Sequence, residues 1–119
     1  MYKSWKLFLD DQIHDSDAPD RHVPEGFIGA ASSAEAMRLV QELGPPEYMD
    51  LDHDLGLLPD GSEDNAKVFL KWLTENYWNF PPKDFHVHSA NVASGGKPWI
   101  ESHIRCWKNV CEEERLSRL

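Results

Sequence analysis

Short apolar runs separated by polar segments give the first outline of the chain. Residues 5–9 form a run that is too short for a helix and ends at an acidic pair, which predicts a buried strand. Apolar or alternating runs at 27–31, 48–52 and 85–89 predict three more strands. Residues 14–26 are polar, contain two prolines and keep no helical period, so we expect a loop after the first strand.

Three further segments carry apolar positions at helical spacing. The first, at 32–43, starts with the capping pair Ser32 and Glu35 and stops at Gly44. A second helix is predicted at about 62–78 and a third at about 98–116. The positions expected to face the core are Ala36, Met37, Val40 and Leu43 in the first helix, Ala66, Phe69, Leu70, Leu73 and Tyr77 in the second, and Ile100, Ile104, Trp107 and Cys111 in the third.

The order strand, loop, strand, helix, strand, helix, strand, helix is typical of an α/β protein with a parallel sheet. Crossovers are expected to be right-handed. The expected strand order, counted along the predicted strands, is 2-1-3-4, with the first and third strands at the centre. We therefore expect a small three-layer sandwich in which a loop replaces the helix between the first two strands. The chain 1–119 is expected to form a single domain.

Charge and cysteine content narrow the possible partners. The net charge is −9, from 21 acidic and 12 basic residues. A chain this acidic is a poor non-specific binder of nucleic acid or of an anionic membrane, since both need cationic patches. Cys106 and Cys111 lie about 140° apart around a helix and are poor disulfide partners. Reduced thiols and the absence of an export-signal pattern predict a cytoplasmic protein.

Polar clusters follow three of the four predicted strands. Asp10 and Asp11 follow the first, carboxylates at 50, 52 and 54 run through the end of the third, and a polar segment at 88–91 follows the fourth. Bare carboxylates are costly on a packed face, so they belong where a strand runs out or where a cation neutralises them. The carboxyl ends of parallel strands lie at one edge of a sheet, where α/β proteins bind their ligands. We therefore predict a functional site at this edge.

Three motifs carry a resemblance to a known family: Leu9-Asp10-Asp11, then Asp-His-Asp-Leu-Gly at 52–56, then His-Ser-Ala-Asn at 88–91. Together they resemble the receiver fold of response regulators, which is flavodoxin-like, and in detail its divergent branch of cyclic-phosphate processing receiver-like domains. The resemblance runs from about residue 6 to the final helix. Ordinary receivers carry a lysine at the end of a fifth strand; here Lys97 follows Ser89 after only seven residues, too few for a helix and a strand.

The resemblance implies metal-assisted hydrolysis of a phosphoester, with a cyclic phosphate of a nucleotide or RNA end as substrate. Carboxylates are hard ligands that suit Mg²⁺ or Mn²⁺, so Asp10, Asp11 and Asp52 are the expected metal ligands. His88 or His53 is the expected general acid or base.

Three more polar residues complete the predicted site. Ser89 and Asn91 are expected to donate hydrogen bonds to the phosphoryl oxygens as charge builds on them. Asp54 is expected either to orient His53 or to complete the metal shell.

Two other classes of function remain open from the sequence. One is a phosphoacceptor or partner-binding receiver without hydrolysis, in which Asp52 accepts the phosphoryl group and Ser89 senses it. The other is a binding protein that kept the fold and lost the chemistry, which would need Trp72, Trp78 and Trp99 to be exposed. A dinucleotide-binding Rossmann domain is disfavoured because no G-x-G-x-x-G motif follows the first strand. A zinc site is disfavoured because the two cysteines share no ligand spacing with the histidines.

Overall fold

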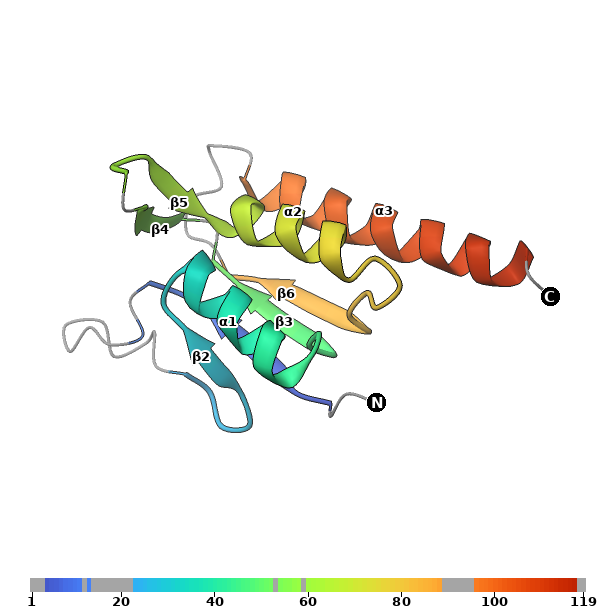
Figure 1. Cartoon of the computed structure of the whole chain (residues 1–119), viewed down its shortest axis with the longest axis horizontal. Coiled ribbons are helices and arrows are strands. Elements are labelled where there is room, and N and C mark those ends of the chain that lie inside the picture. The colour runs from blue at the N-terminus through green and yellow to red at the C-terminus, as the bar shows by residue number, and fades with distance from the viewer. Residues whose placement is uncertain are drawn as a thin grey trace.

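A computed structural model of the chain describes residues 4–11, 13, 23–52, 54–58, 60–88 and 96–117. Its main sheet has four parallel strands in the order β2-β1-β3-β6 (Figure 1). This confirms the predicted order 2-1-3-4, because β6 is the fourth strand expected from the sequence. The strands are β1 (Lys6–Leu9), β2 (Ile28–Ala30), β3 (Tyr48–Leu51) and β6 (Asp84–Val87).

Three helices pack side by side on one face of this sheet: α1 (Ser33–Leu43), α2 (Ala66–Asn76) and α3 (Gly96–Ser117) (Figure 1). Alternate residues of a strand point to the same side, so one set of strand side chains faces the helices. That set forms a common buried core with Ala36, Phe69 and Ile104 from the three helices. Its members from the strands are Leu7, Leu9, Ala30, Met49, Leu51 and Val87.

The first helix follows its sequence signals closely. The Ser32 hydroxyl accepts a hydrogen bond from the Glu35 amide at 3.1 Å, and the Glu35 carboxylate accepts one from the Ala31 amide at 2.6 Å. Gly44 ends the helix with a φ of 87°, a conformation that favours glycine. Leu43 is 36% exposed, so the buried stripe stops before this residue.

The second helix begins later than predicted. Asn65 caps it by accepting a hydrogen bond from the Lys67 amide at 2.9 Å, and residues 62–65 are not helical. Instead, β5 (Glu63–Asn65) pairs antiparallel with β4 (Asp54–Leu57) in a hairpin that the sequence did not predict. The register shifts within this hairpin, at a bulge where Gly56 has a φ of 85°. Glycine adopts this backbone conformation at little cost, whereas other residues are strained in it.

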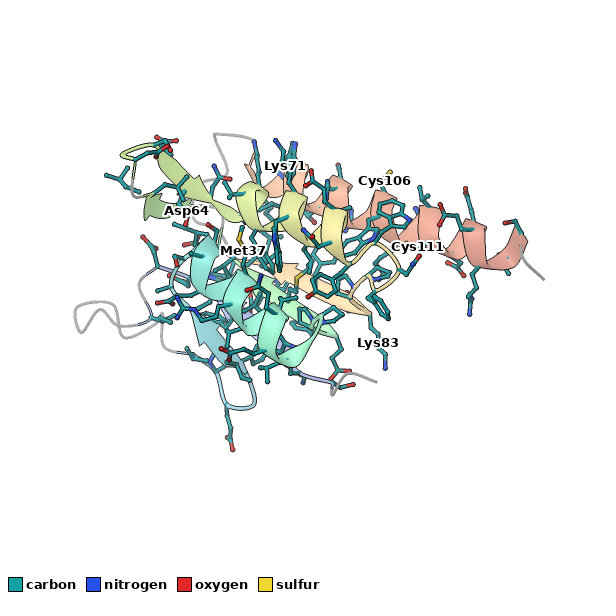
Figure 2. The ribbon with its side chains drawn as sticks, in the orientation of Figure 1. Met37, Asp64, Lys71, Lys83, Cys106 and Cys111 are labelled. Atoms are coloured by element: carbon teal, nitrogen blue, oxygen red, sulfur yellow. The ribbon has the colours of Figure 1, made fainter. Side chains whose placement is uncertain are left out.

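Asp64 connects the hairpin to the helical layer. Its side chain is only 3% exposed, and its Oδ2 atom accepts a hydrogen bond from the amide of Ser33, the first residue of α1, at 3.0 Å. Figure 2 shows Asp64 between β5 and the start of α1. A carboxylate at this place satisfies one of the unpaired amides of the helix and complements its dipole.

We expect Asp64→Ala to lower the free energy of unfolding by about 1 kcal/mol, the usual cost of losing a helix cap. Asp64→Asn keeps an acceptor oxygen and should lose less. Urea denaturation of both variants measures this, with Glu63→Ala as the control because its side chain is exposed on the same strand. An Asp64→Ala variant as stable as Glu63→Ala would contradict the role given to Asp64.

The opposite face of the sheet is covered differently. A Cβ atom at Gly29 would collide with the Val23 side chain and lie 3.1 Å from Ile13, so residues on either side of the first predicted loop cross over this face. Among the residues that the structure describes, no helix covers this second face of the sheet. The third layer of the expected sandwich is therefore not helical within the described residues. The expected absence of a helix between the first two strands falls on residues 14–22, outside the described residues.

Two further expectations concern membranes and cysteines. None of the helices in the described ranges combines the length and apolar character needed to cross a bilayer. Cys106 and Cys111 are both free thiols, as their spacing predicted.

Candidate functional site

Asp10, Asp52 and His88 each occupy the first position after a strand of the main sheet. The last residues of β1, β3 and β6 are in register, so the next residue of each strand falls in one row at the carboxyl edge. The Asp52 amide donates to the carbonyl of Leu9 at 2.8 Å. The His88 amide donates to the carbonyl of Leu51 at 3.0 Å. These hydrogen bonds extend the ladder by one step and hold the three backbones beside one another.

The side chains of this row converge. One ligand atom from each of Asp10, Asp52 and His88 can be chosen so that all three lie within 4.8 Å of one another. Asp10 is fully buried and Asp52 is 6% exposed, while the His88 side chain keeps 17% of its surface accessible. Of the three side chains, that of His88 is therefore the most exposed.

The His88 ring lies between two carboxylates. Its Nε2 atom lies 3.0 Å from Oδ2 of Asp10, and its Nδ1 atom lies 2.5 Å from Oδ1 of Asp50. The ring also stacks in parallel on Phe8, with a centroid distance of 4.8 Å. Since ionised carboxylates only accept hydrogen bonds, both contacts are satisfied when both ring nitrogens carry a proton. The geometry therefore suits an imidazolium held in a fixed orientation.

The net electrostatic effect on His88 agrees with that geometry. Burial by itself lowers the pKa of His88, because it disfavours the charged ring. The hydrogen bond and charge of Asp50, followed by Asp10 and Asp52, outweigh burial and raise the pKa above its usual value of 6.5. A larger fraction of His88 is therefore charged near neutral pH than of a free histidine.

Asp50 is the residue that the sequence interpretation missed. It lies within β3, opposite His86 in the register with β6, and its side chain is 17% exposed. The sequence held one indication of its role: residues two apart in a strand point to the same face, so Asp50 lies on the same face as Asp52. Its partner is 38 positions away in sequence, so no local pattern indicated the contact.

The raised pKa of His88 predicts a pH-dependent stability. The folded-state pKa lies above the unfolded value, so this contribution is complete below about pH 6.5 and disappears as the pH rises through the folded pKa. We expect His88→Gln to lose about 1.5–3 kcal/mol of unfolding free energy at pH 5.5, as for hydrogen bonds to charged groups, and clearly less at pH 9. Urea denaturation in a chelating buffer at both pH values measures this. An equal loss at both would contradict the charged state assigned to His88.

The other predicted site residues fall outside this group of three. Asp11 is exposed, and its Oδ2 atom lies 3.8 Å from where a Cβ at Gly56 would be, so it faces the β4 side of the site. Asp54 begins β4, but its side chain is not described. His53, Ser89 and Asn91 lie outside the described residues. Their roles, and the role of Asp11 as a metal ligand, stay predictions.

The cluster has the composition and size of a divalent-cation site. Two ligands of one ion with bond lengths of about 2.0–2.6 Å lie at most about 5 Å apart, and the three ligand atoms meet this limit. Two of them are carboxylates, the ligands that Mg²⁺ and Mn²⁺ prefer. Asp10 and Asp52 therefore fit the predicted metal.

The sequence comparison places the whole sheet and this cluster in one family. Residues 5–105 match the family described as the cyclic-phosphate processing receiver domain. The chain belongs to this family. The match runs from just before β1 into α3, so it includes the three residues of the cluster. Comparisons with curated proteins and with solved structures found no match.

Membership of the family confirms the resemblance drawn from the three motifs, and the four-stranded parallel sheet confirms the receiver-like fold. Receiver domains bind Mg²⁺ through acidic residues, and Asp10 and Asp52 supply an acidic cluster at the corresponding edge. One difference from ordinary receivers is visible: Lys97 lies in the first turn of α3, and the described residues contain no fifth strand in the main sheet.

Proposed function

We propose that this receiver-like domain is a metal-dependent phosphoesterase that hydrolyses a cyclic phosphate. The observation that carries the proposal is the position of His88, which shares the cluster with Asp10 and Asp52 while Asp50 holds its other ring nitrogen. Two hard oxygen donors next to an oriented, titratable imidazole are the groups that phosphoester hydrolysis needs. The family description supports the cyclic phosphate as substrate.

Asp10 and Asp52 would hold Mg²⁺ or Mn²⁺, with Asp11 as the further predicted ligand. A bound divalent cation neutralises phosphate charge and activates water. The two buried carboxylates are preorganised for this task, because the backbone hydrogen bonds of the sheet edge fix their main chains.

His88 supplies the proton for the departing oxygen. Water adds to phosphorus, one P–O bond of the cyclic ester breaks, and the freed oxygen takes the proton from Nε2 of His88. The proton lost by the water restores the charged ring, and the product is a phosphomonoester. The raised pKa of His88 keeps this acid protonated near neutral pH.

Asp50 positions the acid. Its hydrogen bond to Nδ1, together with the Phe8 ring stacked on the imidazole, restricts rotation of the His88 ring and directs Nε2 towards the cluster. A carboxylate behind a catalytic histidine also stabilises its charged form.

The test is a panel of 2′,3′-cyclic nucleotides and cyclic-phosphate-ended RNA, each incubated with the protein in Mg²⁺, in Mn²⁺ and in chelator. We expect at least one substrate to give a phosphomonoester in the presence of a cation and none in chelator. Failure to turn over any member of the panel with either cation would count against the proposal.

The phosphoacceptor alternative is favoured by one observation, the position of Asp52 directly after β3. Against it stand Lys97 within α3 and the contact between His88 and Asp10. The binding-protein alternative needed three exposed tryptophans. Trp72, Trp78 and Trp99 are instead partly buried and packed against the core, so they are not the exposed tryptophans that this alternative requires.

A further inference from the structure

A groove of about 520 Å³ lies between α2 and α3, and its lining contains none of the residues of the acidic cluster. Its volume falls within the range of small-molecule sites, about 300–1,000 Å³. The lining is mainly aromatic, from Trp78, Trp99 and Trp107, with hydroxyl, imidazole and thiol groups among the rings.

Two helical stripes build this groove. Lys67, Lys71 and Thr74 follow one another along α2 at helical spacing, and Trp78 continues the stripe in the turn after the helix. Trp99, His103 and Cys106 form the facing stripe on α3. Figure 2 shows Lys71 and Cys106 projecting from α2 and α3 toward the same side of the molecule. The groove therefore runs along the two helices. Lys67 and Lys71 lie beside it on the α2 stripe, next to Trp99 and His103, and Trp78 and Trp107 line its other end.

His103 gives the groove a fixed hydrogen-bond acceptor. The Thr74 hydroxyl donates to the carbonyl of Leu70 at 2.6 Å, so its oxygen accepts from Nε2 of His103 at 2.8 Å. Burial, and then the Lys71 ammonium, lower the pKa of His103 below its usual value of 6.5, which favours the neutral ring. Its Nδ1 atom then has a lone pair to offer a ligand, while Trp99 stacks on the ring with a centroid distance of 4.9 Å.

Two lysines beside the groove give its border a positive charge, in contrast to the chain as a whole: Lys67 lies next to Trp99, and the charge of Lys71 acts on His103. Within the part of the chain that the structure describes, no carboxylate forms an ion pair with Lys67 or Lys71. Lys67 lies 5.2 Å from the centroid of the Trp99 ring. It also belongs to the first turn of α2, where the helix dipole adds positive potential. On a chain of net charge −9, this border selects an anion.

We propose that the α2–α3 groove is a second ligand site, for a small planar aromatic anion of the nucleotide kind. The ring packs among the tryptophans and takes a hydrogen bond at His103, and the phosphate lies at Lys67 and Lys71. A neutral apolar ligand would gain nothing from the two ammonium groups, and a simple phosphate would leave the aromatic part of the groove empty. The proposal does not depend on the hydrolase activity.

Protection of Cys106 from a thiol reagent tests the site in the full-length chain. Cys106 lines the groove and is exposed, so it is the thiol that reports on binding. Cys111 is the internal control: burial and the Glu114 carboxylate raise the pKa of its thiol, so it reacts more slowly. The probes are AMP, adenosine and ribose 5-phosphate, in chelating buffer, and intact mass follows the labelling. We expect saturating AMP to slow the labelling of Cys106 about tenfold or more. Adenosine and ribose 5-phosphate, which each carry only part of AMP, should protect Cys106 only at much higher concentrations.

Variants locate the binding. Lys71→Gln should raise the AMP concentration needed for protection about tenfold, as for loss of a charged hydrogen bond. Two control variants should leave this AMP concentration unchanged. Lys83→Gln removes an exposed lysine remote from the groove, and Asp52→Asn alters the acidic cluster. Calorimetric titration of AMP into Cys106→Ser checks the affinity without the thiol. The proposal is overturned if millimolar AMP gives no protection, if ribose 5-phosphate protects as well as AMP, or if Asp52→Asn abolishes protection while Lys71→Gln does not.

Discussion

His88→Ala is expected to lower the turnover of a cyclic phosphate by about 10²–10⁴-fold, the range found when a general acid or base is removed. The loss should appear in kcat, because the proton is needed only as the leaving oxygen departs. Added imidazole should restore part of the activity, since it can enter the space of the missing ring and carry the same proton. The rate of phosphomonoester release measures both effects.

His86 provides the matched control for this variant. It lies on the same strand, two residues earlier and facing the same side, but it is exposed. His86→Ala should change turnover by less than about twofold, as for a surface substitution outside the site. If His86→Ala and His88→Ala reduce turnover equally, or if imidazole restores nothing, the role of His88 as the acid is wrong.

Asp10→Asn is expected to abolish metal-dependent stabilisation. A cation that binds only the folded state at 100 times its Kd adds about 2.7 kcal/mol, which should raise the Tm of wild type by roughly 10 °C. Asp10 is a fully buried member of the cluster, and an amide oxygen there is a much weaker ligand than a carboxylate. Thermal denaturation with and without Mn²⁺ measures the shift.

Two controls make the metal experiment specific. Asp84→Asn removes an exposed carboxylate at the start of β6, the far end of that strand from the cluster, and should keep the full shift. His88→Ala should keep most of it, because oxygen ligands dominate the binding of Mg²⁺ and Mn²⁺. A wild-type Tm that does not respond to millimolar Mn²⁺, or a shift that persists in Asp10→Asn, would contradict the metal site.

The sheet and the acidic cluster could be predicted because both depend on local patterns. Apolar runs located the strands, and the polar residue after each run located the carboxyl edge. The parallel register then brought Asp10, Asp52 and His88 into one row, as expected from their place after the strands. Leu43, which the helical pattern placed toward the core, is instead 36% exposed, whereas Val40 in the same turn is buried.

The parts that escaped prediction depend on contacts between distant residues. The β4–β5 hairpin includes a glycine bulge and an acidic strand, Glu63–Asn65, whose residue types are rare in strands. Its burial of Asp64 against α1 is a tertiary contact across 31 positions. Asp50 was passed over for the same reason, since only the fold places it beside His88.

The central claim is that Asp10, Asp52 and His88 form a hydrolytic centre rather than a phosphorylation switch. Phosphorus NMR of a 2′,3′-cyclic nucleotide with the protein and Mn²⁺, paired with intact-mass analysis after treatment with an acyl-phosphate donor, tests it most directly. Hydrolysis predicts that the cyclic-phosphate resonance is replaced by that of a phosphomonoester, that Asp52→Asn prevents this, and that no stable adduct forms. An unchanged cyclic phosphate together with a stable phosphoryl group on Asp52 would contradict it.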